Sequence, residues 1–224
     1  MTCKTSDNLN LYYEVQGNTE SSETIVLLNG LTQTTVAWYF VLPFFKDKYK
    51  LILVDFIFQG QSDKPAEWRN FDQHADDLKR LLEQEKINEV NILGLSYGSL
   101  VAQHFAVNHS TFINKLILIS TFANKTPYYE AIELSWWRAL EFGGYNLMQA
   151  TKERKDYRPD LEKINLPVLI IQGEKDLLLP VHLAQEVNKH IKNSKLIIVK
   201  NAGHTLNLEH VPEVCGYVNE FLEA

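Results

Sequence analysis

Six short apolar segments recur along the chain, and each is hydrophobic on successive residues rather than on alternate ones. They are rich in β-branched residues. Strands of this kind are covered on both faces, as in a parallel sheet packed between layers of helices. The six predicted strands are residues 25–28, 51–54, 90–93, 116–119, 168–171 and 196–199.

Segments with the spacing of amphipathic helices lie between the predicted strands. Phe71, Ala75, Leu78 and Leu82 recur at turn spacing, and so do the apolar residues of 183–191. Alternating strands and helices predict an α/β fold with a doubly wound, mostly parallel central sheet flanked by helices. Ligands of such sheets bind beyond the carboxyl ends of the strands, so we expect the chemistry where strands end.

Two segments depart from this alternation. Residues 9–15 alternate loosely between apolar and polar, which predicts an antiparallel edge hairpin. Residues 121–166 contain no strand signal and form an aromatic insert, with a predicted break at Gly143-Gly144. The insert is either a lid over a site, which its position after a strand favours, or ordinary helix packing. Its aromatic residues are Tyr128, Tyr129, Trp136, Trp137, Phe142 and Tyr145.

Composition removes several classes of function. The 224 residues carry 22 Lys and Arg against 28 Asp and Glu, a net charge of -6, and no basic block follows a phosphate backbone, so nucleic acid is not the expected partner. Cys3 and Cys215 stand in unrelated contexts, which fits a reducing compartment and indicates no zinc site. No apolar segment approaches the roughly 20 residues of a membrane span. We therefore expect a soluble, cytoplasmic protein that does not act on a membrane.

A candidate nucleophile stands at the end of the third predicted strand, in the sequence Gly94-Leu95-Ser96-Tyr97-Gly98 before a helical segment. In this strand-turn-helix context the G-x-S-x-G pattern predicts a nucleophile elbow, a tight turn that lifts a serine hydroxyl clear of the sheet. The flanking glycines leave room for the turn, and the start of the helix offers N–H groups toward negative charge. Ser96 is the predicted nucleophile.

A base and an orienting carboxylate follow Ser96, in the chain order serine, acid, histidine. Asp176 comes just after the fifth predicted strand, and His204 comes just after the sixth. Because parallel strands end at one edge of the sheet, three loops far apart in sequence can bring Ser96, Asp176 and His204 into contact. Glu174 is a local alternative to Asp176, and we expect it to be solvated.

These residues resemble the α/β-hydrolase superfamily, in particular its single-domain esterase and lactonase-like branch, over nearly the whole chain. The Asn-Ala-Gly-His sequence at 201–204, with Glu209 and Pro212 behind it, resembles the histidine loop of that family and the start of its last helix. The resemblance implies an α/β-hydrolase core domain formed by residues 1–120 and 167–224, with residues 121–166 as a reduced lid.

The loop after the second predicted strand resembles the family only in part. Asp55, Gly60, Ser62 and Pro65 follow the family pattern, whereas residues 57–58 are Ile-Phe where the family commonly has Arg-Gly. The difference concerns the shape of this loop and leaves the predicted triad unchanged.

A second departure lies after the first predicted strand, where the family usually has His-Gly and this chain has Asn29-Gly30-Leu31. The resemblance implies an oxyanion hole formed by the backbone N–H groups of Leu31 and Tyr97, and backbone donors survive a change of side chain. Gly30 is expected to let the loop approach the reacting oxygen closely. Asn29 either orders the loop by hydrogen bonding or is a neutral replacement.

Most of the other polar and aromatic residues are expected to be structural or exposed. His104, on the helix after Ser96, is expected to be a packed or surface residue rather than a base, and five histidines without a partner pattern are assigned to structure or solvent. Trp38 and Tyr39 either line an acyl pocket or pack in the core. The mixed-charge segment 152–156 predicts a solvated face. The five histidines are His74, His109, His182, His190 and His210.

The resemblance implies a metal-free serine hydrolase that needs no cofactor and cleaves a small-molecule carboxylic ester or related acyl bond. Its alternatives are an acyltransferase or a carbon–carbon bond hydrolase of the same fold, and a non-catalytic member that binds a small ligand. The insert is shorter than the caps of this branch, with residues 144–149 as the place where cap residues are absent. Either the lid is reduced and the site open, or the sequence lacks a segment there.

Overall fold

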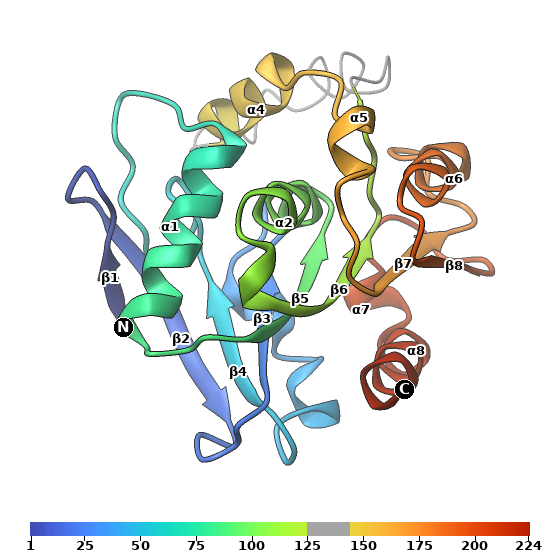
Figure 1. Ribbon diagram of the computed structural model, residues 1–224, viewed down its shortest axis with the longest axis horizontal. Helices are drawn as coiled ribbons and strands as arrows, with labels where there is room; N and C mark the ends of the chain where they lie inside the picture. The colour runs from blue at the N-terminus through green and yellow to red at the C-terminus, as the bar shows by residue number, and fades with distance from the viewer. Residues whose placement is uncertain (125–143) are drawn as a thin grey trace.

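The computed structural model describes residues 1–124 and 144–224, and over these residues it contains one sheet of eight strands (Figure 1). The strand order is β1-β2-β4-β3-β5-β6-β7-β8. β2 pairs antiparallel with β1 and β4, and all the other pairs are parallel. The strands are β1 Thr2–Lys4, β2 Asn10–Gly17, β3 Thr24–Leu28, β4 Lys50–Val54, β5 Val90–Leu95, β6 Ile113–Ile119, β7 Val168–Gly173 and β8 Ser194–Val199.

All six strands predicted from apolar segments are present, each extended by one or more residues. The predicted edge hairpin is also confirmed, because β1 and β2 pair antiparallel, with Cys3 opposite Leu11. β1 itself was not predicted, because three residues are too few to display a period. The mostly parallel sheet confirms the predicted α/β fold class.

Helices cover both faces of the sheet, as strands that are apolar on successive residues require. α1, α2 and α6 contribute to one apolar layer, and α8 with the segment around η1 and η2 contributes to the other. The helices are α1 Phe71–Gln84, α2 Tyr97–Asn108, α4 Gly144–Glu153, α5 Arg158–Leu161, α6 Val181–His190, α7 Leu206–Glu209 and α8 Val211–Glu223, with 3-10 turns η1 Thr35–Trp38, η2 Leu42–Phe44 and η3 Ser110–Phe112. None of these described helices is long and apolar enough to cross a bilayer.

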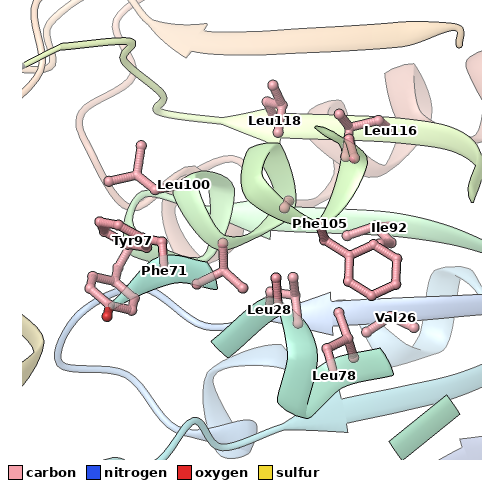
Figure 2. Close-up of a cluster of buried hydrophobic side chains, with 14 of the residues drawn as sticks. Val26, Leu28, Phe71, Leu78, Ile92, Tyr97, Leu100, Phe105, Leu116 and Leu118 are labelled. Atoms are coloured by element: carbon pink, nitrogen blue, oxygen red, sulfur yellow. The ribbon is translucent and has the colours of Figure 1, made fainter. Parts of the chain in front are cut away.

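The core explains why β3 is apolar at every position. Successive side chains of a strand point to opposite faces, so Val26 and Leu28 join the layer under α1 and α2 (Figure 2), while Ile25 and Leu27 join the layer under α8. Both layers are buried, so β3 packs against the core on each of its faces.

The part of the insert that is described contains α4 and α5, and it corrects one prediction. Arg154, in the segment predicted to be a solvated face, is buried with 5% of its surface exposed, whereas its neighbours Lys155 and Asp156 are exposed. The aromatic residues of the insert at positions 128–142 lie outside the described residues, so the interpretation of the insert as a lid stays a prediction. The division into 1–120, 121–166 and 167–224 stays a prediction.

Candidate active site

Ser96 lies in the tight turn between β5 and α2, at the carboxyl edge of the sheet. Its φ is 50° and its ψ is -113°, a conformation that an L-residue adopts only under local constraint. Two glycines make the turn possible, since a Cβ on Gly94 would lie 2.5 Å from the carbonyl oxygen of Gly98, and a Cβ on Gly98 would lie 2.2 Å from that of Leu28. The predicted elbow is therefore built as its motif requires.

The three residues of the predicted triad form one hydrogen-bonded chain. The Ser96 hydroxyl lies 3.0 Å from His204 Nε2, and His204 Nδ1 lies 2.8 Å from Asp176 Oδ2. Asp176 follows β7 and His204 follows β8, so neighbouring strands deliver both side chains to the end of β5. An ionised carboxylate only accepts hydrogen bonds, so Nδ1 carries the ring proton and Nε2 is left to accept the proton of Ser96.

The Asp176 carboxylate is held by four donors in a buried position. Oδ1 accepts the N–H groups of Leu178 at 2.9 Å and Leu179 at 2.8 Å, and Oδ2 accepts Gln172 Nε2 at 2.9 Å besides His204. Burial acts to raise the pKa of Asp176, but these hydrogen bonds and the charge of His204 outweigh burial and lower the pKa below its ordinary value. The carboxylate is therefore ionised at neutral pH.

The residues on either side of His204 are held in place by hydrogen bonds to Glu209. Glu209 accepts hydrogen bonds from the Gly203 N–H at 2.9 Å and from the Thr205 hydroxyl at 2.6 Å. The bond from Thr205, against a smaller effect of burial, lowers the pKa of Glu209. Ser120, which follows β6, donates from Oγ to the carbonyl of His204 at 3.1 Å. The roles of Ser120 and Gln172 were not predicted, because a lone hydroxyl or amide in a sequence does not indicate which group it will bind.

The loop after β3 is ordered by Asn29, which decides between its two interpretations. Asn29 Nδ2 donates to the carbonyl of Val54 at 2.7 Å and to Asp55 Oδ1 at 3.0 Å, and its Oδ1 accepts Trp38 Nε1 at 2.7 Å. An added Cβ on Gly30 would meet its nearest atom at 3.4 Å, an ordinary contact. Packing within the protein thus does not require a glycine at position 30.

A pocket of about 310 Å³ opens beside Ser96 and His204. Its described lining is mostly apolar, with Leu95 from β5 and other leucines from the two adjoining loops, and His204 is the one titratable residue among the described lining residues. The other leucines are Leu31, Leu178 and Leu179. Trp38 and Tyr39 are not among these lining residues: Trp38 is buried against Asn29, and the Tyr39 hydroxyl donates to Glu14 at 2.9 Å.

The remaining predicted candidates take no part in this arrangement. Glu174 is exposed, and its carboxylate accepts the N–H of Asn201 at 2.9 Å rather than a bond from His204. His104 is packed, as predicted, with Nδ1 2.7 Å from Asp72 and Nε2 accepting Arg154 Nε at 3.3 Å. Among the other histidines, His109, His190 and His210 pair with carboxylates at the surface.

Comparison with known proteins decides the family. Residues 23–144, more than half of the chain, match the model described as alpha/beta hydrolase fold. The chain belongs to this family. Residues 146–224 match a second model, described as TAP-like protein, so the two matches adjoin at the start of α4.

Two relatives align with this α/β hydrolase over nearly their whole length. The AB hydrolase superfamily protein YisY of Bacillus subtilis is 26% identical over 265 residues, covering 97% of each chain. The 3-oxoadipate enol-lactonase 2 of Acinetobacter baylyi is 25% identical over 242 residues, covering 92% of this chain and 90% of its own. The chain is accordingly an α/β-hydrolase enzyme.

A solved structure shows the same fold. The crystal structure of a hydrolase from Pseudomonas aeruginosa PA01 superposes with a TM-score of 0.91 at 23% identity, covering 100% of this chain and 98% of its own.

The alignment with YisY also bears on chain length. It spans 265 positions against the 224 residues of this chain, so at least 41 positions of that alignment have no residue in this α/β hydrolase.

Proposed function

We propose that this α/β hydrolase cleaves a carboxylic ester or related acyl bond through an acyl-enzyme formed on Ser96. The observation that carries the proposal is the chain of contacts from Ser96 to His204 at 3.0 Å and from His204 to Asp176 at 2.8 Å, beside an apolar pocket. A hydroxyl within reach of a base that is itself oriented by a carboxylate is the arrangement of an activated nucleophile.

Acylation begins when Ser96 Oγ attacks the carbonyl carbon of the substrate and His204 Nε2 takes the hydroxyl proton. Asp176 remains ionised and stabilises the imidazolium that forms. The C–O bond to the leaving alcohol then breaks, and His204 returns the proton to the alcohol oxygen. A water molecule repeats the sequence on the acyl-enzyme, releasing the carboxylic acid and restoring the Ser96 hydroxyl.

The developing negative charge on the carbonyl oxygen is stabilised by the backbone N–H groups of Leu31 and Tyr97. Leu31 lies in the pocket lining beside Ser96, and Tyr97 begins α2. Donors of this kind are fixed before the reaction starts, and each contributes roughly 3 to 4 kcal/mol of transition-state stabilisation.

The pocket favours a small or medium apolar acyl group. Its volume of about 310 Å³ and its leucines suit a short alkyl or aryl chain, and no described lining residue carries a fixed positive charge to bind an anionic acyl group. Nitrophenyl esters of acetate, butyrate and hexanoate are therefore expected to have higher kcat/KM values than the monoanionic succinate ester. A preference for the succinate ester would contradict this assignment.

A fluorophosphonate probe tests the nucleophile, and ester hydrolysis tests the reaction. The wild type is expected to be labelled and to hydrolyse the esters, while Ser96→Ala loses labelling and about three or more orders of magnitude in kcat. Ser110→Ala, which removes an exposed hydroxyl on η3, is the matched control and is expected to retain both activities. An unlabelled wild type, or full activity in Ser96→Ala, would overturn the proposal.

The same samples separate the alternatives. Labelling of Ser96 without turnover of any ester indicates a different bond, such as a carbon–carbon bond, and no labelling at all indicates a member that only binds its ligand. Product analysis with added alcohol or thiol distinguishes transfer to that acceptor from release of the free acid.

A further inference from the structure

The side chain of Gln59 is buried, with 4% of its surface exposed, and lies beside the loop after β3. It belongs to the turn that follows β4, where the Gln59 N–H donates to the carbonyl of Phe56 at 2.7 Å. From there Gln59 Nε2 donates to two carbonyls of the candidate oxyanion loop, that of Gly30 at 2.7 Å and that of Leu31 at 3.2 Å. One amide thus bridges two loops that are far apart in the sequence.

The orientation of this amide is set by its surroundings. Gln59 Oε1 accepts the N–H of Phe56 at 3.2 Å and Asn29 Nδ2 at 3.4 Å, while Nε2 has two carbonyl oxygens in front of it. A rotated amide would place oxygen against two carbonyl oxygens and nitrogen against two donors. Gln59 is therefore fixed as the donor to Gly30 and Leu31.

This contact determines the direction of the Leu31 N–H. The described peptide bonds are all trans, and in a planar trans peptide the C=O and the N–H point in opposite directions. Because the Gly30 carbonyl points at Gln59, the Leu31 N–H of the same peptide plane points away from Gln59. Within residues 1–124 and 144–224 this N–H has no hydrogen-bond acceptor, and Gly30 and Leu31 both line the pocket beside Ser96.

We propose that Gln59 is the positioning residue of the oxyanion hole: by holding the Gly30–Leu31 peptide from behind, it aims the Leu31 N–H at the carbonyl oxygen of the substrate. The inference rests on the proposed function and deepens it, since it concerns the same site. Gly30 also accepts the N–H of Gln33 at 3.1 Å, which closes a turn. Gln59 adds the second donor on that carbonyl, and it is the described donor to the carbonyl of Leu31.

Gln59→Met is the direct test, because methionine has a similar length and cannot donate a hydrogen bond. Its kcat on the preferred ester is expected to fall about 10- to 100-fold, with KM within threefold of the wild type, because the lost contact acts on the transition state. Gln61→Met is the matched control: it is the same change two residues away at an exposed position and is expected to stay within twofold of the wild type.

A second readout separates positioning from a structural role. The thionoester of the same substrate develops its charge on sulfur, which is a weaker hydrogen-bond acceptor than oxygen, so a misplaced donor harms the ester more than the thionoester. The ratio of ester to thionoester kcat/KM is expected to fall about tenfold in Gln59→Met. This ratio is measured on one sample, so it does not depend on how much of the variant is folded.

Each outcome is decisive. An unchanged ratio in Gln59→Met, whether total activity falls or not, overturns the positioning role. Should this variant fail to fold, Gln59→Asn takes its place, since the shortened amide no longer reaches both carbonyls, and its ratio is judged by the same criterion. A wild type without Ser96-dependent ester hydrolysis would instead overturn the proposed function, so the two failures are distinguishable.

Discussion

Phe58 occupies a backbone conformation that glycine adopts most readily. Its φ is 82°, and it is the third residue of the Phe56–Gln59 turn, the position that needs positive φ in a type II turn. A side chain there costs about 1 to 2 kcal/mol. The Phe58 ring is 1% exposed within the larger core, and burial of a phenylalanine contributes about 2 to 3 kcal/mol. Burial of the ring therefore offsets the strain in this chain.

Replacing Phe58 by alanine or by glycine separates these two effects. Both variants lose the ring, but only alanine retains the strain. We expect Phe58→Ala to be less stable than Phe58→Gly by roughly 0.5 to 1 kcal/mol, after allowing for the larger unfolded-state entropy of glycine. Urea unfolding of both variants measures the difference.

Phe56 supplies the control for this comparison. It is equally buried, and its φ lies outside the left-handed region. At that position the order is expected to reverse, with the glycine variant the less stable by roughly 0.5 to 1 kcal/mol. If alanine were the more stable replacement at position 58 as well, the strain assigned to Phe58 would be wrong.

The sequence identified residues whose type announces their chemistry, and it missed those that act through a tertiary contact. Ser96, Asp176 and His204 stand at strand ends in a recognisable order, so their contact could be expected from topology. Gln59 holds the loop after β3 by hydrogen bonds to two carbonyls 28 and 29 positions away, and Gln172 donates to the carboxylate of Asp176 in the loop that follows its own strand. A glutamine in a sequence gives no indication of which carbonyl it faces.

At the scale of elements, a strand or helix could be predicted from the sequence when it was long enough to repeat its apolar pattern. The six strands and the amphipathic α1 and α6 repeat a pattern often enough to be recognised. The four-residue helices α5 and α7 do not, because one turn cannot show a 3.6-residue period. The mixed-charge segment 152–156 misled for a related reason: charge alone indicates solvent, whereas the fold encloses Arg154 between α4, α2 and the strand end.

Arg154 connects α4 to the core that supports the elbow. Its guanidinium donates to Gln103 Oε1 at 2.5 Å and to the carbonyls of Phe122 and Ala123 at 3.2 and 3.1 Å, and it lies 4.6 Å from the centre of the Tyr157 ring. Gln103 in turn donates to the Thr121 hydroxyl at 2.7 Å. The fork of donors thus joins three segments that are remote in sequence.

Removal of this fork is expected to destabilise the fold. Arg154→Met leaves the Gln103 oxygen without its donor in a buried site, and we expect the free energy of unfolding to fall by about 2 kcal/mol in urea titrations. Arg154→Lys recovers only part of the loss, because an ammonium cannot reproduce the planar donor geometry. Lys155→Met, one residue away and exposed, is expected to change the stability by under about 0.5 kcal/mol. Equal effects at positions 154 and 155 would contradict the connecting role.

At the scale of the whole molecule, the sheet lies between two apolar layers. In a domain that unfolds cooperatively, a charge formed in either layer changes the stability of the entire fold. His74 on α1 is the buried group for which this matters most. Its ring packs 5.3 Å from Phe56 and 5.9 Å from Tyr97, and neither ring nitrogen has a hydrogen-bond partner in the described part of the chain. Burial, with a smaller effect of the Arg69 charge, lowers its pKa to about 3.

This pKa makes the molecule sensitive to acid. Between pH 6.5 and pH 3 the unfolded state binds a proton at His74 that the folded state does not, so the free energy of unfolding decreases as the pH falls. Phenylalanine fits the same ring contacts without titrating. We expect His74→Phe to lose less stability than the wild type between pH 7 and pH 5, by about 2 kcal/mol, as measured by urea unfolding across that range.

Comparing the wild type with His74→Phe separates the effect of His74 from that of Asp77. Burial, against the opposing charge of Arg69, raises the pKa of Asp77 to about 6, so Asp77 titrates in the same range with the opposite sign. Asp77 is present in both proteins, and its contribution cancels in the difference between them. His74→Gln, which does not titrate but keeps buried polar atoms, is expected to share the reduced acid sensitivity of His74→Phe while being less stable at every pH. Parallel pH profiles for the wild type and both variants would mean that His74 is not the acid-sensitive group.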